Sequence, residues 1–508
     1  MNNKKELLVN ISAQIIGFSV NLGLSFFLTP YIVNNVGGEA YGFIGLANNF
    51  VSYAQVITVA LNSMASRFIT IKIYKNDNDG ASRYFTSVVV ANIFLAFAML
   101  IPSAFVIIFL ERIVIVSKYI LWDVKLLWAF IFVNFIISII SSTFSVATFA
   151  TNKLYLSSVN AIISQMLKVF VLILFYKMFT PSVWYVGLAT IVSTIYIMLW
   201  DIRYTKKLLP DIKFKKKYFD LNSIKEILSS GIWSSINQIT VILSSGLDLL
   251  VTNIFVGSIE MGIMAISKTI PNAMSLLLGS VSNVFSPSMT QLYAEKKNKE
   301  LILTLKRSMK IMSIFAVIPN GILISFGMAF YNLWVPNENA NLLYILSVLA
   351  CINSVITGTI YPMYSVVTII NKVKISSIAN IFRSILSTII TIIIIYFTDF
   401  DLYAIAGTSS LFSILYSLIF YIPFISNSLE VSWYTFYREV IESILATIIL
   451  SIIGLQINNV FISDSWVMLM IVCVCYTFVS FVVLYFVIFN RIERKAILEN
   501  FRNIIIRR

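Results

Sequence analysis

Long apolar runs separated by short polar segments make up most of this chain. Fourteen runs approach or exceed the roughly 20 residues that a membrane-spanning helix needs. They lie at 7–33, 41–66, 85–110, 126–150, 154–178, 182–202, 227–256, 262–290, 311–335, 342–369, 374–397, 400–424, 439–457 and 466–489. The first run is too long for a signal-peptide core, so we interpret it as a retained span. The pattern predicts an all-α polytopic membrane protein with about 14 transmembrane helices.

The composition also indicates a membrane protein, and it excludes or disfavours several classes of chemistry. Of the 508 residues, 59% are hydrophobic and 12% are charged, whereas soluble domains carry about 25% charged residues. The chain has no histidine and only three cysteines, all within apolar runs, which excludes histidine-based catalysis and disfavours a zinc site. No polar gap is long enough for a soluble domain. We therefore expect no enzyme, metal or cofactor, although a coupling ion, H⁺ or Na⁺, stays open.

The basic residues give an orientation. With the N-terminus inside, 30 of the 37 Lys and Arg residues fall in inner segments, four in outer segments and three within spans. This bias predicts that both termini face the cytoplasm. The net charge of +14 then orients the protein and faces anionic lipid, so no nucleic-acid partner is expected.

Short motifs recur in order at a nearly constant offset, which indicates an internal repeat. The pairs are Val36-Gly37 with Gly42 against Val256-Gly257 with Gly262, Ile101-Pro102 against Ile318-Pro319, and Asn152-Lys153 against Asn371-Lys372. Biased composition is the alternative explanation. Each motif takes the same place in a six-helix pattern, so the repeat predicts two lobes of like orientation, related by an axis along the membrane normal.

The repeat also sets the expected domain boundaries. The segments are an N-lobe at 1–202, a basic cytoplasmic linker at 203–226, a C-lobe at 227–424, two extra helices at 425–489 and a basic cytoplasmic tail at 490–508.

Charged residues within the spans are the first candidates for function, because each costs about 2.5–3.5 kcal/mol to insert. We singled out Lys168, Asp248, Lys268 and Arg383. Asp248 and Lys268 are predicted at equal depth on neighbouring helices. They either pair with each other, or Lys268 contacts an anion and Asp248 modulates the charge of Lys268.

Lys168 and Arg383 occupy repeat-equivalent helices, because Arg383 corresponds to Ser164, one turn from Lys168. Both are therefore expected to point in the same relative direction, toward the protein interior or a central cavity. The net positive charge of the four residues favours an anionic substrate such as a diphosphate.

Polar amides on the first two helices of each half form a second candidate set. They are Asn48, Asn49, Gln55, Asn62, Asn237 and Gln238. Hydrogen bonding between helices is one interpretation, and contact with sugar hydroxyls in a polar cavity is the other.

One segment carries a family resemblance. Residues 36–47 read Val-Gly-Gly-Glu-Ala-Tyr-Gly-Phe-Ile-Gly-Leu-Ala, which resembles the first outer hairpin of polysaccharide-repeat-unit (O-antigen-type) flippases. These form the polysaccharide transporter family of the multidrug/oligosaccharidyl-lipid/polysaccharide (MOP) exporter superfamily. The predicted lobes and the basic linker extend the similarity over the whole chain.

The resemblance implies a flippase that moves undecaprenyl-diphosphate-linked oligosaccharide from the inner to the outer leaflet of the bacterial cytoplasmic membrane by alternating access. It implies a cationic cavity between lobes, with Lys268 where such flippases commonly place a cation. A polysaccharide polymerase and a chain-length regulator are the implied partners. The first helix lacks the arginine of the peptidoglycan-precursor branch, which argues against that substrate.

Two alternatives remain. An ion-coupled multidrug exporter of the same superfamily would need a buried carboxylate in the first helix, whereas residues 7–33 carry no charge. A membrane glycosyltransferase or polymerase would need a sizeable outer loop with catalytic acids, and we expect no outer loop longer than about fifteen residues.

Overall fold

The structure is a computed structural model that describes residues 3–370, 372–461, 464–489 and 493–494. Within these residues every regular element is helical and there is no strand. Contacts divide the chain into two units, residues 1–266 and 267–508. The structure therefore confirms the predicted all-α class.

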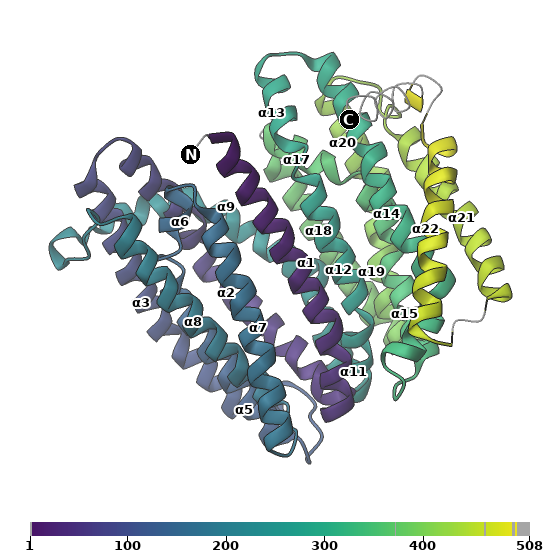
Figure 1. The fold of residues 1–508 in the computed structure, drawn as a ribbon, viewed down its shortest axis with the longest axis horizontal. Coiled ribbons are helices and arrows are strands. Elements are labelled where there is room, and N and C mark those ends of the chain that lie inside the picture. Colours follow the sequence, from purple (N-terminus) through teal and green to yellow (C-terminus); the bar gives the residue numbers. More distant parts are fainter. Residues whose placement is uncertain (1–2, 371, 462–463, 490–492, 495–508) are drawn as a thin grey trace. The chain divides into compact units, whose positions relative to one another are not determined.

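The first unit runs from purple to teal in Figure 1. Its elements are α1 (Asn3–Val36), α2 (Gly38–Tyr74), α3 (Asn78–Ile108), α4 (Leu110–Ile113), α5 (Leu121–Ser141), α6 (Val146–Ala150), α7 (Leu154–Met178), α8 (Trp184–Leu208), the 3₁₀ turn η1 (Lys216–Tyr218), α9 (Leu221–Val241), the π-helix η2 (Ile242–Gly246), α10 (Asp248–Phe255) and α11 (Ser258–Ser267).

The second unit runs from teal to yellow. Its elements are α12 (Thr269–Ser282), α13 (Ser286–Ala294), α14 (Asn298–Trp334), α15 (Ala340–Cys351), α16 (Asn353–Thr359), α17 (Tyr361–Ile369), α18 (Val373–Phe397), α19 (Asp401–Leu415), the π-helix η3 (Tyr416–Tyr421), α20 (Ile422–Ser428), α21 (Tyr437–Val460) and α22 (Trp466–Val487).

Twelve helical stretches among the described residues are long and apolar enough to cross a membrane, as expected for a polytopic membrane protein. The other two expected spans coincide with α1 and with the interrupted stretch α9–η2–α10. The count of fourteen stays a prediction.

The internal repeat is visible in the bounds of the elements. Helices α7 and α18 each contain 25 residues, and both ends are displaced by 219 positions. The turns before α3 and α14 each contain a residue with positive φ, Asn76 at 56° and Lys296 at 57°. The helices that the sequence motifs equate thus begin in similar backbone conformations.

The contact division falls between Ile266 and Ser267, not at the predicted linker. Helices α9, α10 and α11, up to Ile266, pack in the first unit although the repeat assigns them to the C-lobe. The first division follows contacts between residues, whereas the second follows the internal sequence repeat. The lobe boundaries stay a prediction.

Helices α2 and α9 pack closely through small residues. A Cβ atom on Gly231 of α9 would overlap the carbonyl oxygen of Ala60 on α2. Nearby, the Ser235 hydroxyl donates to the Val56 carbonyl at 2.6 Å. Small residues let the two backbones approach, which is how helices associate where lipid removes the hydrophobic driving force.

We therefore expect Gly231→Ala to lower stability by about 1–3 kcal/mol, because the added methyl group forces α2 and α9 apart. Gly407→Ala is the matched control, since a Cβ at that helical position meets nothing within 4 Å. Thermal unfolding of the purified protein in detergent measures both. Equal unfolding midpoints for the two variants would contradict the close approach.

Candidate functional site

Arg383 lies half-buried on α18 beside aromatic side chains. Its Nε donates to Oδ1 of Asn380 at 2.8 Å, and Nη2 donates to Oγ of Ser384 at 3.2 Å. The guanidinium carbon is 5.7 Å from the ring centre of Tyr416, within the range of a cation–π interaction. The structure thus places this predicted cation beside the ring of Tyr416 within the second unit.

The π-helix η3 explains how two tyrosines reach this position. Residues five apart in an α-helix point about 140° away from each other, whereas the i→i+5 register of a π-helix brings them to one face. The rings of Tyr416 and Tyr421 are 5.8 Å apart, and Tyr421 lies 4.7 Å from Tyr364 of α17. We call Tyr364, Arg383, Tyr416 and Tyr421 the Arg383–tyrosine cluster.

Lys168 occupies α7, the helix equivalent to α18. It lies one turn beyond Ser164, whose hydroxyl donates to the Ser193 carbonyl of α8 at 3.2 Å. An i,i+4 spacing keeps Lys168 on the face of Ser164. Its ammonium has no hydrogen bond or ion pair with any residue that the structure describes.

Asp248 begins α10, directly after the π-helix η2 and Leu247. The Tyr53 hydroxyl of α2 donates to the carbonyl of Gly246, two residues before Asp248, at 2.6 Å. Lys268 is half-buried between α11 and α12. Because Asp248 and Lys268 belong to different units, their pairing stays a prediction.

The predicted amides are more scattered. Asn48 is exposed, and its side chain donates to the Ile44 carbonyl of its own helix at 2.8 Å. Asn49, Gln55 and Gln238 are half-buried. The side chain of Asn237 lies outside the described part of the structure.

Asn62 of α2 is the predicted amide that does make contacts between helices. Asn92 of α3 is fully buried, and its Nδ2 donates to Oδ1 of Asn62 on α2 and to Oγ1 of Thr143, at 2.9 Å each. Our sequence reasoning did not select Asn92. The sequence feature that could have indicated Asn92 is its position as a lone amide in the apolar run at 85–110.

Buried carboxylates were also missed. Asp201 of α8 is 6% exposed and Glu439 of α21 is 4% exposed, yet both lie inside the apolar runs at 182–202 and 439–457. Asp201 forms no ion pair with the residues that the structure describes. The charge within the apolar helices is therefore more balanced than the four selected residues indicated.

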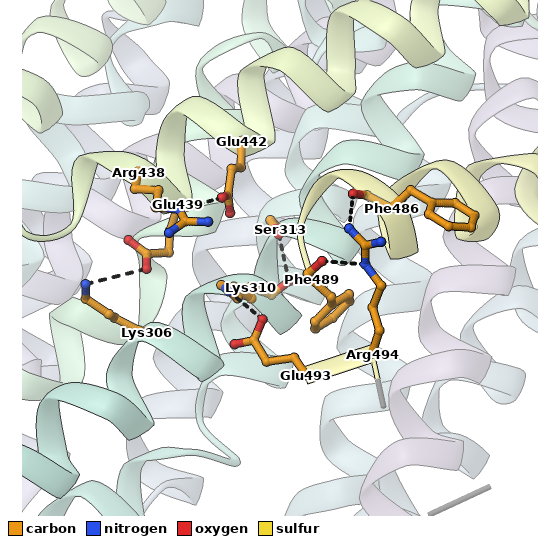
Figure 2. Close-up of polar contacts among 10 residues, drawn as sticks. All are labelled: Lys306, Lys310, Ser313, Arg438, Glu439, Glu442, Phe486, Phe489, Glu493 and Arg494. Atoms are coloured by element: carbon orange, nitrogen blue, oxygen red, sulfur yellow. Dashed lines mark hydrogen bonds and ion pairs between the residues drawn. The ribbon is translucent and has the colours of Figure 1, made fainter. Parts of the chain in front are cut away.

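Figure 2 shows where Glu439 lies, among charged side chains of α14, α21 and the chain after α22. The ion pairs are Lys306–Glu439 at 3.8 Å, Lys310–Glu493 at 2.7 Å and Arg438–Glu442 at 2.8 Å. Arg494 donates to the carbonyls of Phe486 and Phe489 at the end of α22. The pairs balance in charge. Lys306–Glu439 joins α14 to α21, Lys310–Glu493 joins α14 to the chain after α22, and Arg438–Glu442 lies within α21. We therefore interpret this ionic cluster as structural.

The ends of two hairpins meet within the first unit. A Cβ on Gly42 would lie 2.9 Å from Cα of Gly262. Glu39 accepts hydrogen bonds from the Tyr119 hydroxyl at 2.8 Å and from the Ser117 amide at 3.3 Å. We call these five residues the hairpin seal, which lies on the predicted outer side.

Comparison with known proteins supports a transporter fold. No family model matches the chain. It is 26% identical to the uncharacterized membrane protein EpsK of Bacillus subtilis (strain 168), over 97% of this chain and 98% of that protein. Among solved structures, an inward-facing multidrug resistance MATE family transporter of the MOP superfamily matches with a TM-score of 0.70 and 13% identity, over 84% of this chain and 99% of that one.

Lipid II flippase MurJ in an inward closed conformation matches with a TM-score of 0.65 and 15% identity, over 94% of this chain and 99% of that one. A MOP superfamily transporter from Pyrococcus furiosus has a TM-score of 0.63 and 14% identity, over 84% of this chain and 96% of that one. The chain has the fold of the MOP superfamily transporters. This agrees with the expected resemblance at the level of the fold, and the flippase family stays a prediction.

The ionic cluster leads to a testable prediction about stability. Lys310→Met leaves the Glu493 carboxylate, which is 25% exposed, without its cation, and we expect a loss of about 1–3 kcal/mol after discounting for solvent. Adding Glu493→Met should recover much of this loss. Thermal unfolding of both single variants and the double variant measures the coupling.

The exposed pair Arg438–Glu442 serves as the control for this cycle. Arg438 is 69% exposed, so its coupling should stay below about 1 kcal/mol. If the losses of Lys310→Met and Glu493→Met simply add, the buried pair does not stabilise the fold.

Proposed function

We propose that the protein is a flippase for undecaprenyl-diphosphate-linked oligosaccharide repeat units in surface polysaccharide biosynthesis. It moves them from the inner to the outer leaflet of the bacterial cytoplasmic membrane and acts as a carrier, not an enzyme. In this proposal both termini face the cytoplasm, and a polysaccharide polymerase and a chain-length regulator act beside it. The observation that carries it is the Arg383–tyrosine cluster within the MOP fold.

The chemistry of this cluster suits a phosphate next to a sugar. A guanidinium presents a rigid fork of donors that fits phosphate oxygens. The neighbouring tyrosines combine apolar ring faces with hydroxyl groups, which matches the two faces of a sugar ring. Lys168 and Lys268 add positive charge in apolar helices, where a charge is retained only at a cost.

The extent of the structural matches also supports a lipid-linked substrate. The MurJ match covers 94% of this chain, whereas the MATE match covers 84%. The difference is about as long as the two helices α21 and α22. The lipid II flippase thus matches a longer part of this chain than the multidrug transporter does.

Alternating access requires contacts that close one side and later separate. The hairpin seal is suited to this role because it depends on backbone contact at Gly42 and Gly262 and on two hydrogen bonds to Glu39. Such a contact can separate and re-form without leaving an unpaired cation in the membrane.

An ion-coupled multidrug exporter is the second candidate, and Asp201 is the observation that favours it. A buried carboxylate without a basic partner among the described residues can bind H⁺ or Na⁺. The uncharged stretch of α1 at 7–33 still argues against the exporter.

The test is export of surface polysaccharide by cells that lack the native gene and express variants at equal abundance. We expect Arg383→Gln to reduce export about tenfold or more, because a charge-assisted hydrogen bond contributes about 1.5–3 kcal/mol. Lipid-linked repeat units should accumulate on the inner leaflet. Lys268→Gln and Lys168→Gln should act in the same direction.

Lys177→Gln is the matched control, since Lys177 is an exposed cation at the end of α7. Normal export by Arg383→Gln and Lys268→Gln would overturn the proposal. Drug susceptibility that changes with Asp201→Asn while polysaccharide export stays normal would favour the exporter.

A further inference from the structure

The basic segment between α8 and α9 is fastened along the first turns of α3. The Lys213 amide donates to the Ser82 hydroxyl at 3.0 Å, and the Asp220 amide donates to the Ser87 hydroxyl at 2.9 Å. The Thr86 hydroxyl donates to the Lys213 carbonyl at 3.3 Å. The segment predicted as a linker is therefore a docked element, not a free tether.

Side chains add to this docking. The Tyr218 hydroxyl donates to Oδ1 of Asp79 at 2.6 Å, and Tyr84 of α3 donates to the Glu226 carboxylate of α9. Ile212 packs on the core cluster that contains Ile227. Tyrosine rings, an isoleucine and backbone amides thus face α3 or the core.

The groups left outside are basic and apolar together. Lys213, Lys215, Lys216 and Lys217 are exposed. The exposed apolar residues among them and just beyond are Phe214 at 56%, Phe219 at 42% and Leu221 at 60%. Lysines mixed with exposed aromatic residues are typical of segments that lie in the membrane–water interface.

The docking also sets the depth of the segment. Helix α3 is a candidate membrane span, and its apolar run begins near residue 85, so Ser87 lies at the predicted inner edge of the bilayer. Asp220 is held at that level by its bond to Ser87. Phe219 and Leu221 flank Asp220 and are therefore held at the depth of the lipid head groups.

We propose that residues 213–221 form a binding surface for anionic phospholipids of the inner leaflet. The lysines contact the phosphate groups, and Phe214 and Phe219 insert among the head groups. The lysines complement the charge of the phosphate groups. The exposed apolar side chains at head-group depth commit the surface to a lipid bilayer and not to a soluble polyanion. The inference rests on the predicted orientation and is independent of the transported substrate.

A second inner hairpin offers a matched control. Lys296, Lys297 and Lys299 are also exposed. The acidic residues Glu295 and Glu300 flank them, and Lys297 pairs with Glu295 at 2.8 Å. These three lysines should attract much less anionic lipid than Lys215, Lys216 and Lys217 do, because the neighbouring carboxylates offset their charge.

The experiment uses full-length Phe214→Trp protein in nanodiscs of phosphatidylcholine and phosphatidylglycerol in equal amounts. Bromine-labelled chains are placed on one lipid or the other, and quenching is measured as the difference from the parent protein, which supplies the background of its native tryptophans. We expect quenching by the anionic lipid to be at least about threefold stronger, because each lysine near the surface favours anionic lipid several-fold. Lys215→Gln/Lys216→Gln/Lys217→Gln should bring the ratio close to one.

The control triple variant, Lys296→Gln/Lys297→Gln/Lys299→Gln, should leave the ratio unchanged. Equal quenching by both lipids in the starting protein would overturn the selectivity for anionic lipid. Absence of quenching by either lipid would overturn the membrane contact itself. Unchanged thermal unfolding of both triple variants shows that the docked segment has kept its fold.

Discussion

Helices in a bilayer gain nothing from hiding apolar surface from one another, because lipid is as apolar as they are. Association therefore depends on close backbone approach and on polar contacts. Gly231 against Ala60 is the first kind, and Asn92 with Asn62 and Thr143 is the second. The first unit is held together by such contacts far more than by the general apolar character of its helices.

Charged groups in apolar helices also need polar or aromatic partners, and this protein supplies them in two ways. At the ends of α14 and α21, cations and carboxylates pair with each other, and the pairs attach the last two helices. Deeper in α18, Arg383 is surrounded by amide, hydroxyl and aromatic groups. Carboxylates neutralise the cations at the helix ends, whereas amide, hydroxyl and aromatic groups hold the guanidinium of Arg383 in one orientation.

The sequence predicted the features that arise from local patterns. The apolar runs anticipated the helices, and the recurring motifs anticipated the matched bounds of α7 and α18. Features that depend on tertiary contact were not predictable. The apolar run at 400–424 gives no sign of the π-helix η3, yet η3 brings the rings of Tyr416 and Tyr421 together beside α18. The docking of residues 213–221 depends on the hydroxyls of Ser82 and Ser87, which look unremarkable in isolation.

The meeting of Gly42 and Gly262 has a consequence for how this chain can vary. The two glycines occupy corresponding positions of the predicted repeat, yet their surroundings differ. A Cβ on Gly42 would meet the backbone of Gly262, whereas a Cβ on Gly262 would meet the backbone of Gly38 and Glu39. A side chain at either position therefore needs space that main-chain atoms already fill, and no smaller residue elsewhere can make room for it.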